Sequence, residues 1–138
     1  MKTSTYLFYN GKCQEAFKYY EQLLGAKIVA MLTNADTPMA SECPAERLGN
    51  IVHARITIGD AVIMGSDAPP DRYHEQAGFT VTLNVETSEE AERIFAGLSD
   101  GGHAFMPMEE TFFAHRFGMC NDRFGIPWMV LHEKPMGA

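Results

Sequence analysis

Two places in the sequence bring a histidine and an arginine close together: His53 with Arg55, and His115 with Arg116. A histidine titrates near neutral pH, so it could carry a proton in a water-poor site. An arginine could hold an anionic group through paired hydrogen bonds. The alternative is structural, with hydrogen-bonded histidines and with arginines that form salt bridges to some of the 18 acidic residues. The sequence leaves both interpretations open.

Other catalytic and metal-binding arrangements have no support in the sequence. The five histidines form no HxH or HExxH pattern, and no Ser/His/Asp or Cys/His set is evident. Glu109 and Glu110 are adjacent in an expected loop, so they point in different directions. Cys13, Cys43 and Cys120 are odd in number and widely spaced, which fits neither a disulfide framework nor a zinc signature. We expect Cys120 to be an inert, packed thiol.

Charge and hydropathy exclude several classes of partner. The net charge is −7 and no basic block occurs, which argues against nucleic acid. No apolar run approaches the ~20 residues of a membrane-spanning helix. The N-terminal residues enter an expected strand without the apolar region of a signal peptide. With reduced thiols, this predicts a cytoplasmic protein.

The elements that position these residues occur twice. Leu7–Ile28 and Leu83–Phe105 each read as a strand, a helix carrying Glu-Ala, a glycine and a new strand. We therefore predict an α+β fold of two βαβββ modules, residues 1–67 and 78–138, joined by a linker at 68–77. In the first module we expect strands at Thr5–Tyr9, Lys27–Thr33, Val52–Ile58 and Ala61–Gly65, and a helix at Lys12–Leu24 ended by Gly25.

The second module should follow the same order. Thr87 and Glu90 fit a capping box that begins its helix. The expected strands are Phe79–Val85, His103–Met108, Ala114–Cys120 and Pro127–His132. Residues 34–50 lack periodicity, and a loop this long is often a lid or a partner contact.

Strand parity predicts which side chains face a ligand. In Phe79–Val85 the apolar residues should lie under the helix, with Thr80, Thr82 and Asn84 facing a cleft. Applied to the first strand, the same parity places Thr5, Leu7 and Tyr9 toward the cleft and Tyr6 and Phe8 under the helix. Across the Gly59-Asp60 turn, Arg55 pairs with Met64, so His53, Arg55 and Met64 share a face. By parity Trp128 lies under a helix.

Several segments resemble the vicinal oxygen chelate superfamily, which includes glyoxalase I, extradiol dioxygenases and bleomycin-resistance proteins. The segments are EAFKYYEQLLGAKI, GDAVIMGSD and the tail ETFFAHRFGMCNDRFGIPWM. The tail looks most like the PhnB-like branch, often labelled 3-demethylubiquinone-9 3-methyltransferase. The resemblance implies paired modules forming an open, U-shaped mixed sheet around a cleft, and a homodimer.

The resemblance also implies where the superfamily holds its metal. Counting from shared landmarks places the four ligand positions on Thr5, Met64, Thr80 and Met129, none of which suits a hard or borderline divalent metal. We therefore expect no catalytic metal and no cofactor. A methyltransferase that uses S-adenosylmethionine needs a doubly wound sheet with a Gly-rich turn, and the sequence has no such turn.

These expectations predict a metal-free protein that binds a small amphipathic organic molecule in its cleft. The lining residues would be Thr5, Leu7, Tyr9, Met64, Thr80, Thr82, Asn84, Phe117 and Met129. The alternative is a lyase or isomerase, with His53 or His115 as proton carrier and Arg55 or Arg116 holding an anion.

Overall fold

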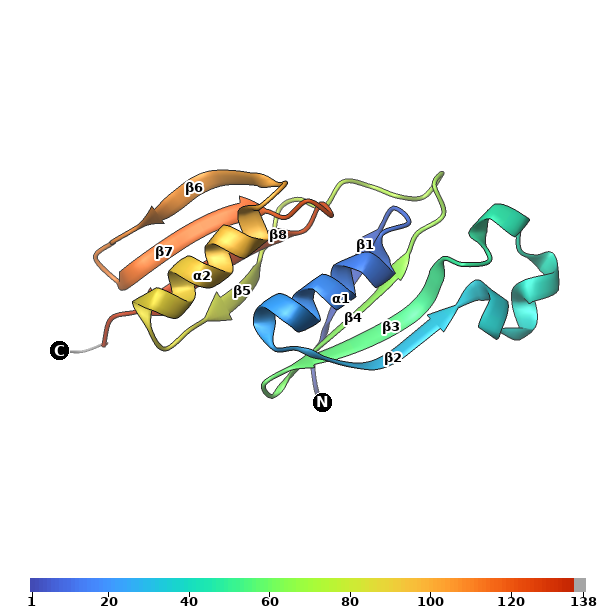
Figure 1. Ribbon diagram of the computed structural model, residues 1–138, viewed down its shortest axis with the longest axis horizontal. Coiled ribbons are helices and arrows are strands. Elements are labelled where there is room, and N and C mark those ends of the chain that lie inside the picture. Colours follow the sequence, from blue (N-terminus) through green and yellow to red (C-terminus); the bar gives the residue numbers. More distant parts are fainter. Residues whose placement is uncertain (136–138) are drawn as a thin grey trace. The chain divides into compact units, whose positions relative to one another are not determined.

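The computed structural model describes residues 1–135, and the chain divides into two compact units, residues 1–74 and 75–138. Each unit runs strand, helix, then three strands (Figure 1). The first unit contains β1 (Thr5–Tyr9), α1 (Cys13–Leu24), β2 (Lys27–Thr33), β3 (Ile51–Ile58) and β4 (Ala61–Asp67). The second contains β5 (Val81–Asn84), α2 (Ser88–Ser99), β6 (His103–Glu109), β7 (Ala114–Asn121) and β8 (Pro127–Glu133).

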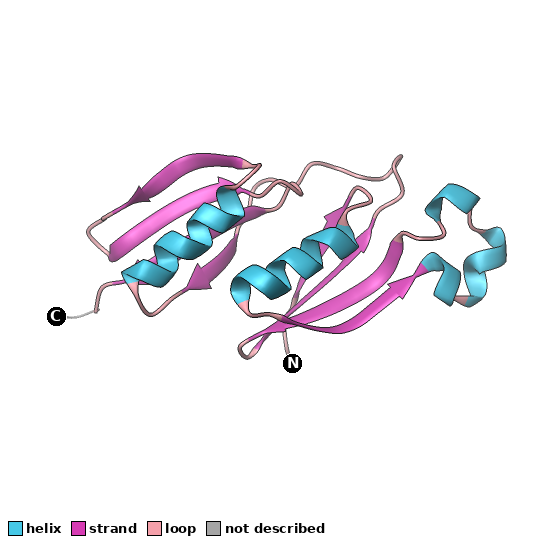
Figure 2. Ribbon diagram, in the orientation of Figure 1, coloured by secondary structure: helices cyan, strands magenta, loops and turns pink. Residues whose placement is uncertain are grey.

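Each unit has one four-stranded mixed sheet, and the two sheets have the same strand order. The orders are β1-β4-β3-β2 and β5-β8-β7-β6. The first two strands of each order are parallel and the remaining pairs are antiparallel. One helix lies along one face of each sheet (Figure 2). The prediction of an α+β fold built from two βαβββ modules is confirmed.

The two helices begin and end where the sequence predicts. Gly25 follows α1 with a φ of 70°, a left-handed conformation that glycine adopts without strain. Thr87 caps α2, because its hydroxyl accepts a hydrogen bond of 3.1 Å from the backbone N–H of Glu90. Each helix buries one apolar stripe against its sheet, centred on Phe17 in α1 and on Phe95 in α2. Among residues 1–135, the helices are all too short or too polar to cross a bilayer.

A strand glycine makes room for each of these phenylalanines. A Cβ atom on Gly65 of β4 would lie 2.8 Å from Cζ of Phe17. On Gly118 of β7 it would lie 2.8 Å from Cε1 of Phe95. Both distances are too short for non-bonded carbon atoms, so the helix–sheet distance depends on glycine at these positions.

Two buried carboxylates organise the ends of the core. Asp67, at the end of β4, accepts hydrogen bonds from the backbone N–H groups of Cys13 (2.9 Å) and Ile51 (2.8 Å). Asp122 accepts from the indole Nε1 of Trp128 at 2.8 Å and from two backbone N–H groups of the β7–β8 turn. Trp128 is fully buried on the helix side of its sheet, which confirms its predicted place.

The segment 34–50 consists of three short 3₁₀-helices, η1 (Asn34–Asp36), η2 (Pro38–Glu42) and η3 (Ala45–Arg47). Its two ends are joined, because the N–H of Asn34 donates to the carbonyl of Asn50 at 3.0 Å. The segment is therefore a closed loop that extends the β2–β3 hairpin. Its role as a lid or a partner contact stays a prediction.

The predicted faces of β1 are wrong. Leu7 and Tyr9 are fully buried on the helix side, where the Tyr9 ring packs edge-on against Phe17 with centroids 5.9 Å apart. Thr5 shares their parity and pairs with the buried Ile63. Tyr6 and Phe8 lie on the opposite face, and Phe8 is 45% exposed. Thr5, Leu7 and Tyr9 are therefore removed from the predicted ligand face.

The fifth strand is shorter than predicted. It begins at Val81, which pairs with Trp128, and Phe79 lies before it and is 42% exposed. The partner strand begins at Pro127, which has no N–H to donate, so the ladder starts one residue later. The parity within the strand is as predicted, since Val81 is buried and Thr82 is exposed.

We expect Gly65→Ala to destabilise the protein by about 1–3 kcal/mol, because the new methyl group would force Phe17 or the backbone of β1 to move. Urea denaturation of the full chain would measure the loss. Gly49→Ala is the matched control, since a Cβ atom there meets nothing within 4 Å. Equal stabilities of the two variants would show that the α1–β4 contact does not limit packing.

Candidate functional site

We define the open face of each sheet as the face opposite its helix. In the first unit the register of β3 and β4 pairs Arg55 with Met64, and His53 has the same parity as Arg55. The Arg55 guanidinium donates to the Met64 thioether at 3.5 Å. The prediction that His53, Arg55 and Met64 share a face is confirmed.

Tyr6 adds a phenolic hydroxyl to this group. Its oxygen lies 3.3 Å from Nδ1 of His53, and the two rings are 5.9 Å apart. Tyr6 also pairs with Met64 in the parallel ladder, so one row crosses the sheet as Tyr6, Met64, Arg55 and Ala30. Tyr6 was not among the predicted site residues, because the predicted strand parity placed its side chain under the helix.

Arg55 is an exposed cation without a carboxylate partner. Within residues 1–135, no carboxylate oxygen lies within 4.0 Å of its guanidinium. The thioether of Met64 is only a weak acceptor. Arg55 is therefore available to an anionic group that approaches the open face beside His53.

The open face of the second unit is made of hydroxyl and thioether groups. The hydroxyl oxygens of Thr80 and Thr82 are 3.2 Å apart. Thr82 pairs with Met129, which pairs with Met119, and this row ends at Met106 on β6. The row is equivalent to the Tyr6–Ala30 row of the first unit, but it has no histidine or arginine.

A pocket of about 500 Å³ lies at one end of this second open face. Its apolar lining comes from Phe79, Phe105, Met119 and Pro127, and its polar lining from Gln76, Thr80 and Asn121. Of the predicted ligand residues, only Thr80 lines this pocket. Met64, Thr82, Asn84, Phe117 and Met129 lie on the open faces by parity, and their contact with a ligand stays a prediction.

Arg116 is engaged on the other side of the second sheet. Its Nε lies 3.0 Å from a carboxylate oxygen of Glu92 on α2. The salt-bridge interpretation is therefore the correct one for Arg116. His115 is exposed, and its ring centroid lies 4.7 Å from that of His132. The structure does not bring His115 and Arg116 together with Met129.

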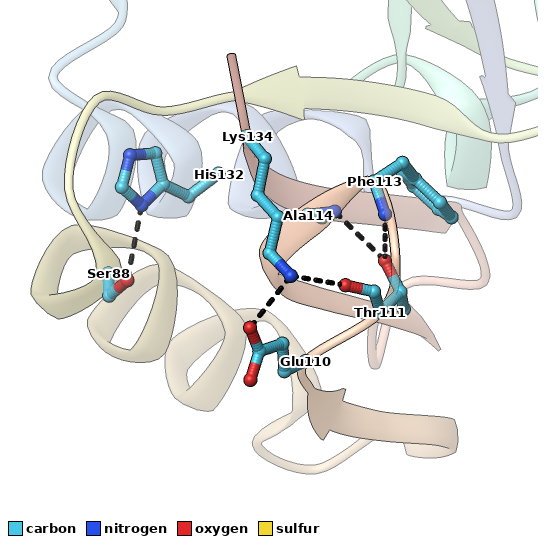
Figure 3. Close-up of polar contacts among 7 residues, drawn as sticks. All are labelled: Ser88, Glu110, Thr111, Phe113, Ala114, His132 and Lys134. Carbon is cyan, nitrogen blue, oxygen red and sulfur yellow. Dashed lines mark hydrogen bonds and ion pairs between the residues drawn. The ribbon is translucent and has the colours of Figure 1, made fainter. Parts of the chain in front are cut away.

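The turn between β6 and β7 is fixed by a lysine that follows β8. Nζ of Lys134 lies 2.7 Å from the Glu110 carboxylate and 2.9 Å from the carbonyl oxygen of Thr111 (Figure 3). The hydrogen bond from Lys134 and its positive charge lower the pKa of Glu110. Glu110 thus anchors the turn through its ion pair with Lys134.

The superfamily's metal positions do not fit a metal in this chain. Met64 and Met129 supply thioethers, and their row neighbours are Tyr6 and Thr82. Within residues 1–135, no group of three or more His, Cys, Asp or Glu side chains could hold a metal ion. This donor set does not match the carboxylate, imidazole and water ligands that hard and borderline divalent metals prefer.

The family of the chain follows from comparison with known proteins. A family model described as 3-demethylubiquinone-9 3-methyltransferase matches residues 1–131. The chain belongs to this family. Protein YjdN of Escherichia coli (strain K12), which is similar to it, is 36% identical over 138 residues, covering 94% of each chain.

Solved structures show that the fold of this chain recurs in other proteins. Protein PA1353 from Pseudomonas aeruginosa is 42% identical, covers 98% of this chain and 99% of its own, and has a TM-score of 0.88. A putative 3-demethylubiquinone-9 3-methyltransferase, PhnB protein, from Bacillus cereus is 25% identical, covering 96% and 99%, with a TM-score of 0.81. The fosfomycin resistance protein FosX from Listeria monocytogenes, complexed with Mn(II), is 9% identical, covers 99% and 94%, and has a TM-score of 0.67. The last likeness shows the fold alone.

The three cysteines of this family member differ in burial. Burial raises the pKa of the Cys13 thiol far above its usual range, and the nearby Asp67 carboxylate raises it further. Burial also raises the pKa of Cys120. Cys43, in the segment 34–50, is only half-buried.

We expect a thiol reagent such as Ellman's reagent to label only Cys43 in the native protein near neutral pH, because the thiolate is the nucleophile. Counting released thiolate by absorbance would check this, and Cys43→Ser should abolish the fast labelling. Denaturant should expose all three thiols. Fast labelling of Cys43→Ser would contradict the burial of Cys13 and Cys120.

Proposed function

We propose that this protein binds a small amphipathic organic molecule on the open face of its second unit. The observation that carries the proposal is the pocket of about 500 Å³ beside β5. Its size falls in the range typical of small-molecule sites.

The composition of the pocket supports an amphipathic ligand. Phe79 and Phe105 are large apolar side chains that remain 42% and 46% exposed, so covering them with a ligand would release water from apolar surface. Met119 adds a flexible, polarizable wall that tolerates ligands of different shape. The hydroxyl of Thr80 and the amide of Asn121 supply hydrogen bonds that would orient a polar end.

The fold supports binding of a small molecule more than methyl transfer. The FosX structure with this fold holds 1S,2S-dihydroxypropylphosphonic acid, a small polar organic compound. Methyl transfer from S-adenosylmethionine typically uses a doubly wound sheet, whereas each unit here has four mixed strands and one helix. The family's name is therefore a weak guide to the activity of this chain.

We expect anilinonaphthalene sulfonate, an amphipathic fluorophore, to bind with a rise in fluorescence and to raise the melting temperature. Phe105→Ala should weaken this binding several-fold, because it removes one wall of the pocket. Phe112→Ala is the matched control, since Phe112 is 93% exposed and lies outside the pocket. Fluorescence titration and differential scanning fluorimetry measure both effects.

Equal binding by the wild type and Phe105→Ala would count against this pocket. If Phe105→Ala does weaken binding, a screen of amphipathic metabolite-like compounds, each competing with the fluorophore, would identify the ligand class. If the fluorophore binds but no compound displaces it, the proposal of a specific ligand fails.

A second candidate function is proton transfer on the open face of the first unit. It is favoured by the Tyr6–His53 contact of 3.3 Å and by the unpaired Arg55 guanidinium on the same strand as His53. His53 would move a proton at a carbon next to a carbonyl, Tyr6 would orient the imidazole, and Arg55 would hold the resulting anion. This is the chemistry of an isomerase or a lyase.

Proton transfer should appear as exchange of a carbon-bound hydrogen when small keto acids or hydroxy ketones are incubated with the protein in deuterated water. We expect His53→Gln to lower the exchange rate about 10²-fold or more, because the proton carrier is lost. Tyr6→Phe should lower it less. His103→Gln serves as the control, and NMR follows the exchange. Exchange that is insensitive to His53→Gln would remove this candidate.

A further inference from the structure

Two histidines of the second unit meet outside the open face. His115 lies in β7 and His132 in the adjacent antiparallel strand β8. The ladder pairs Ala114 with Glu133 and Arg116 with His132, and its register shifts between these pairs, at His115. The shift brings the two imidazole rings beside each other, with centroids 4.7 Å apart and planes inclined by 42°.

This separation matches two imidazoles bound to one metal ion. With metal–nitrogen distances of about 2.0–2.1 Å and ligand angles between square and tetrahedral, the ring centroids stand about 4.5–5.2 Å apart. The rings are inclined to each other, so they are not a parallel stack. The ring separation is therefore compatible with both imidazoles binding one ion.

Ser88 orients one of the two rings. Its hydroxyl oxygen lies 3.1 Å from Nδ1 of His132, and Figure 3 shows the ring turned toward this serine at the start of α2. When Nδ1–H donates to the hydroxyl, the lone pair of Nε2 is free for a metal. Metal-binding histidines are commonly held in this way by a second hydrogen bond.

The charges around the pair do not oppose a cation. Arg116 is neutralised by Glu92 at 3.0 Å, and Lys134 by Glu110 at 2.7 Å. The Glu110 carboxylate is also close enough to His115 to interact with its charge. The acidic side chains thus compensate both neighbouring cations.

We propose that His115 and His132 form a two-histidine site for a divalent transition metal such as Ni²⁺, Cu²⁺ or Zn²⁺. Imidazole ligands suit these ions. Since no cluster of three or more ligand side chains occurs in residues 1–135, water completes the coordination and the ion exchanges readily. The site lies apart from the Met129 and Thr82 positions and does not depend on the proposed ligand pocket.

Titration of the full chain with Ni²⁺ in a calorimeter tests the site. We expect one ion per chain, and a loss of affinity of about 10-fold or more in His115→Ala and in His132→Ala. Ser88→Ala should weaken binding up to about 10-fold, because it removes the hydrogen bond that orients His132. His103→Ala, a histidine of the same unit that is not part of the pair, should bind Ni²⁺ as the wild type does.

Two further readouts separate metal binding from a structural role of the histidines. Ni²⁺ should raise the melting temperature of the wild type and of His103→Ala, but not that of His115→Ala. Affinity should fall as the pH is lowered, because protons compete for the imidazole nitrogens. Since His115 is exposed, its alanine variant is expected to fold, and circular dichroism would check this.

The proposal is overturned if the wild type binds no Ni²⁺, if folded His115→Ala keeps the wild-type affinity, or if His103→Ala loses binding to the same extent. An ion count near one in the wild type, with affinity lowered about 10-fold or more in both variants of the pair, would support it.

Discussion

The close contact of one phenylalanine with one strand glycine is the constraint on which each unit depends. Phe17 meets Gly65 in the first unit, and Phe95 meets Gly118 in the second. The two glycines are not equivalent, because Gly65 is in the central strand next to β1, whereas Gly118 is in the following strand of the order. In the first unit Gly65 pairs with Ala54, and in the second Gly118 pairs with Val130. The same space is kept free by placing the glycine on either of two neighbouring strands.

The repeat in the sequence is strong enough to predict the modules, the helices and the hairpin of Arg55 and Met64, but not the faces of β1. Aligning the two modules on the Glu-Ala pairs of their helices gives one correspondence between their first strands. The strand register gives another, offset by one residue. In that correspondence Tyr6, which pairs with Met64, is equivalent to Thr82, which pairs with Met129. The connection from strand to helix is therefore one residue longer in the first unit. Counting back from the helix shifts the strand by one residue, and such a shift moves every side chain to the other face.

Polar contacts at the helix starts show why other parts of the site could not be predicted. In both units, a side chain near the end of β4 or β8 contacts the first residue of the helix. In the first unit the contact is the Asp67 carboxylate with the N–H of Cys13. In the second it is the His132 imidazole with the hydroxyl of Ser88. The two contacts occupy equivalent places but differ in chemistry, since the first satisfies a backbone N–H and the second joins two side chains, so the repeat in the sequence does not predict them.

The two faces of each sheet are under different constraints. On the helix side, the space between helix and sheet limits the size of the side chains. A single methyl group at Gly65 or Gly118 would collide with a phenylalanine ring. The central row of the open face carries Tyr6, Met64 and Arg55 in one unit and Thr82 with methionines in the other, on ladders of the same order. Because the open-face side chains do not contribute to helix packing, they can change without loss of the fold. This explains how a chain that shares its fold with a protein solved with Mn(II) can have, among residues 1–135, no group of three or more His, Cys, Asp or Glu side chains that could hold a metal ion.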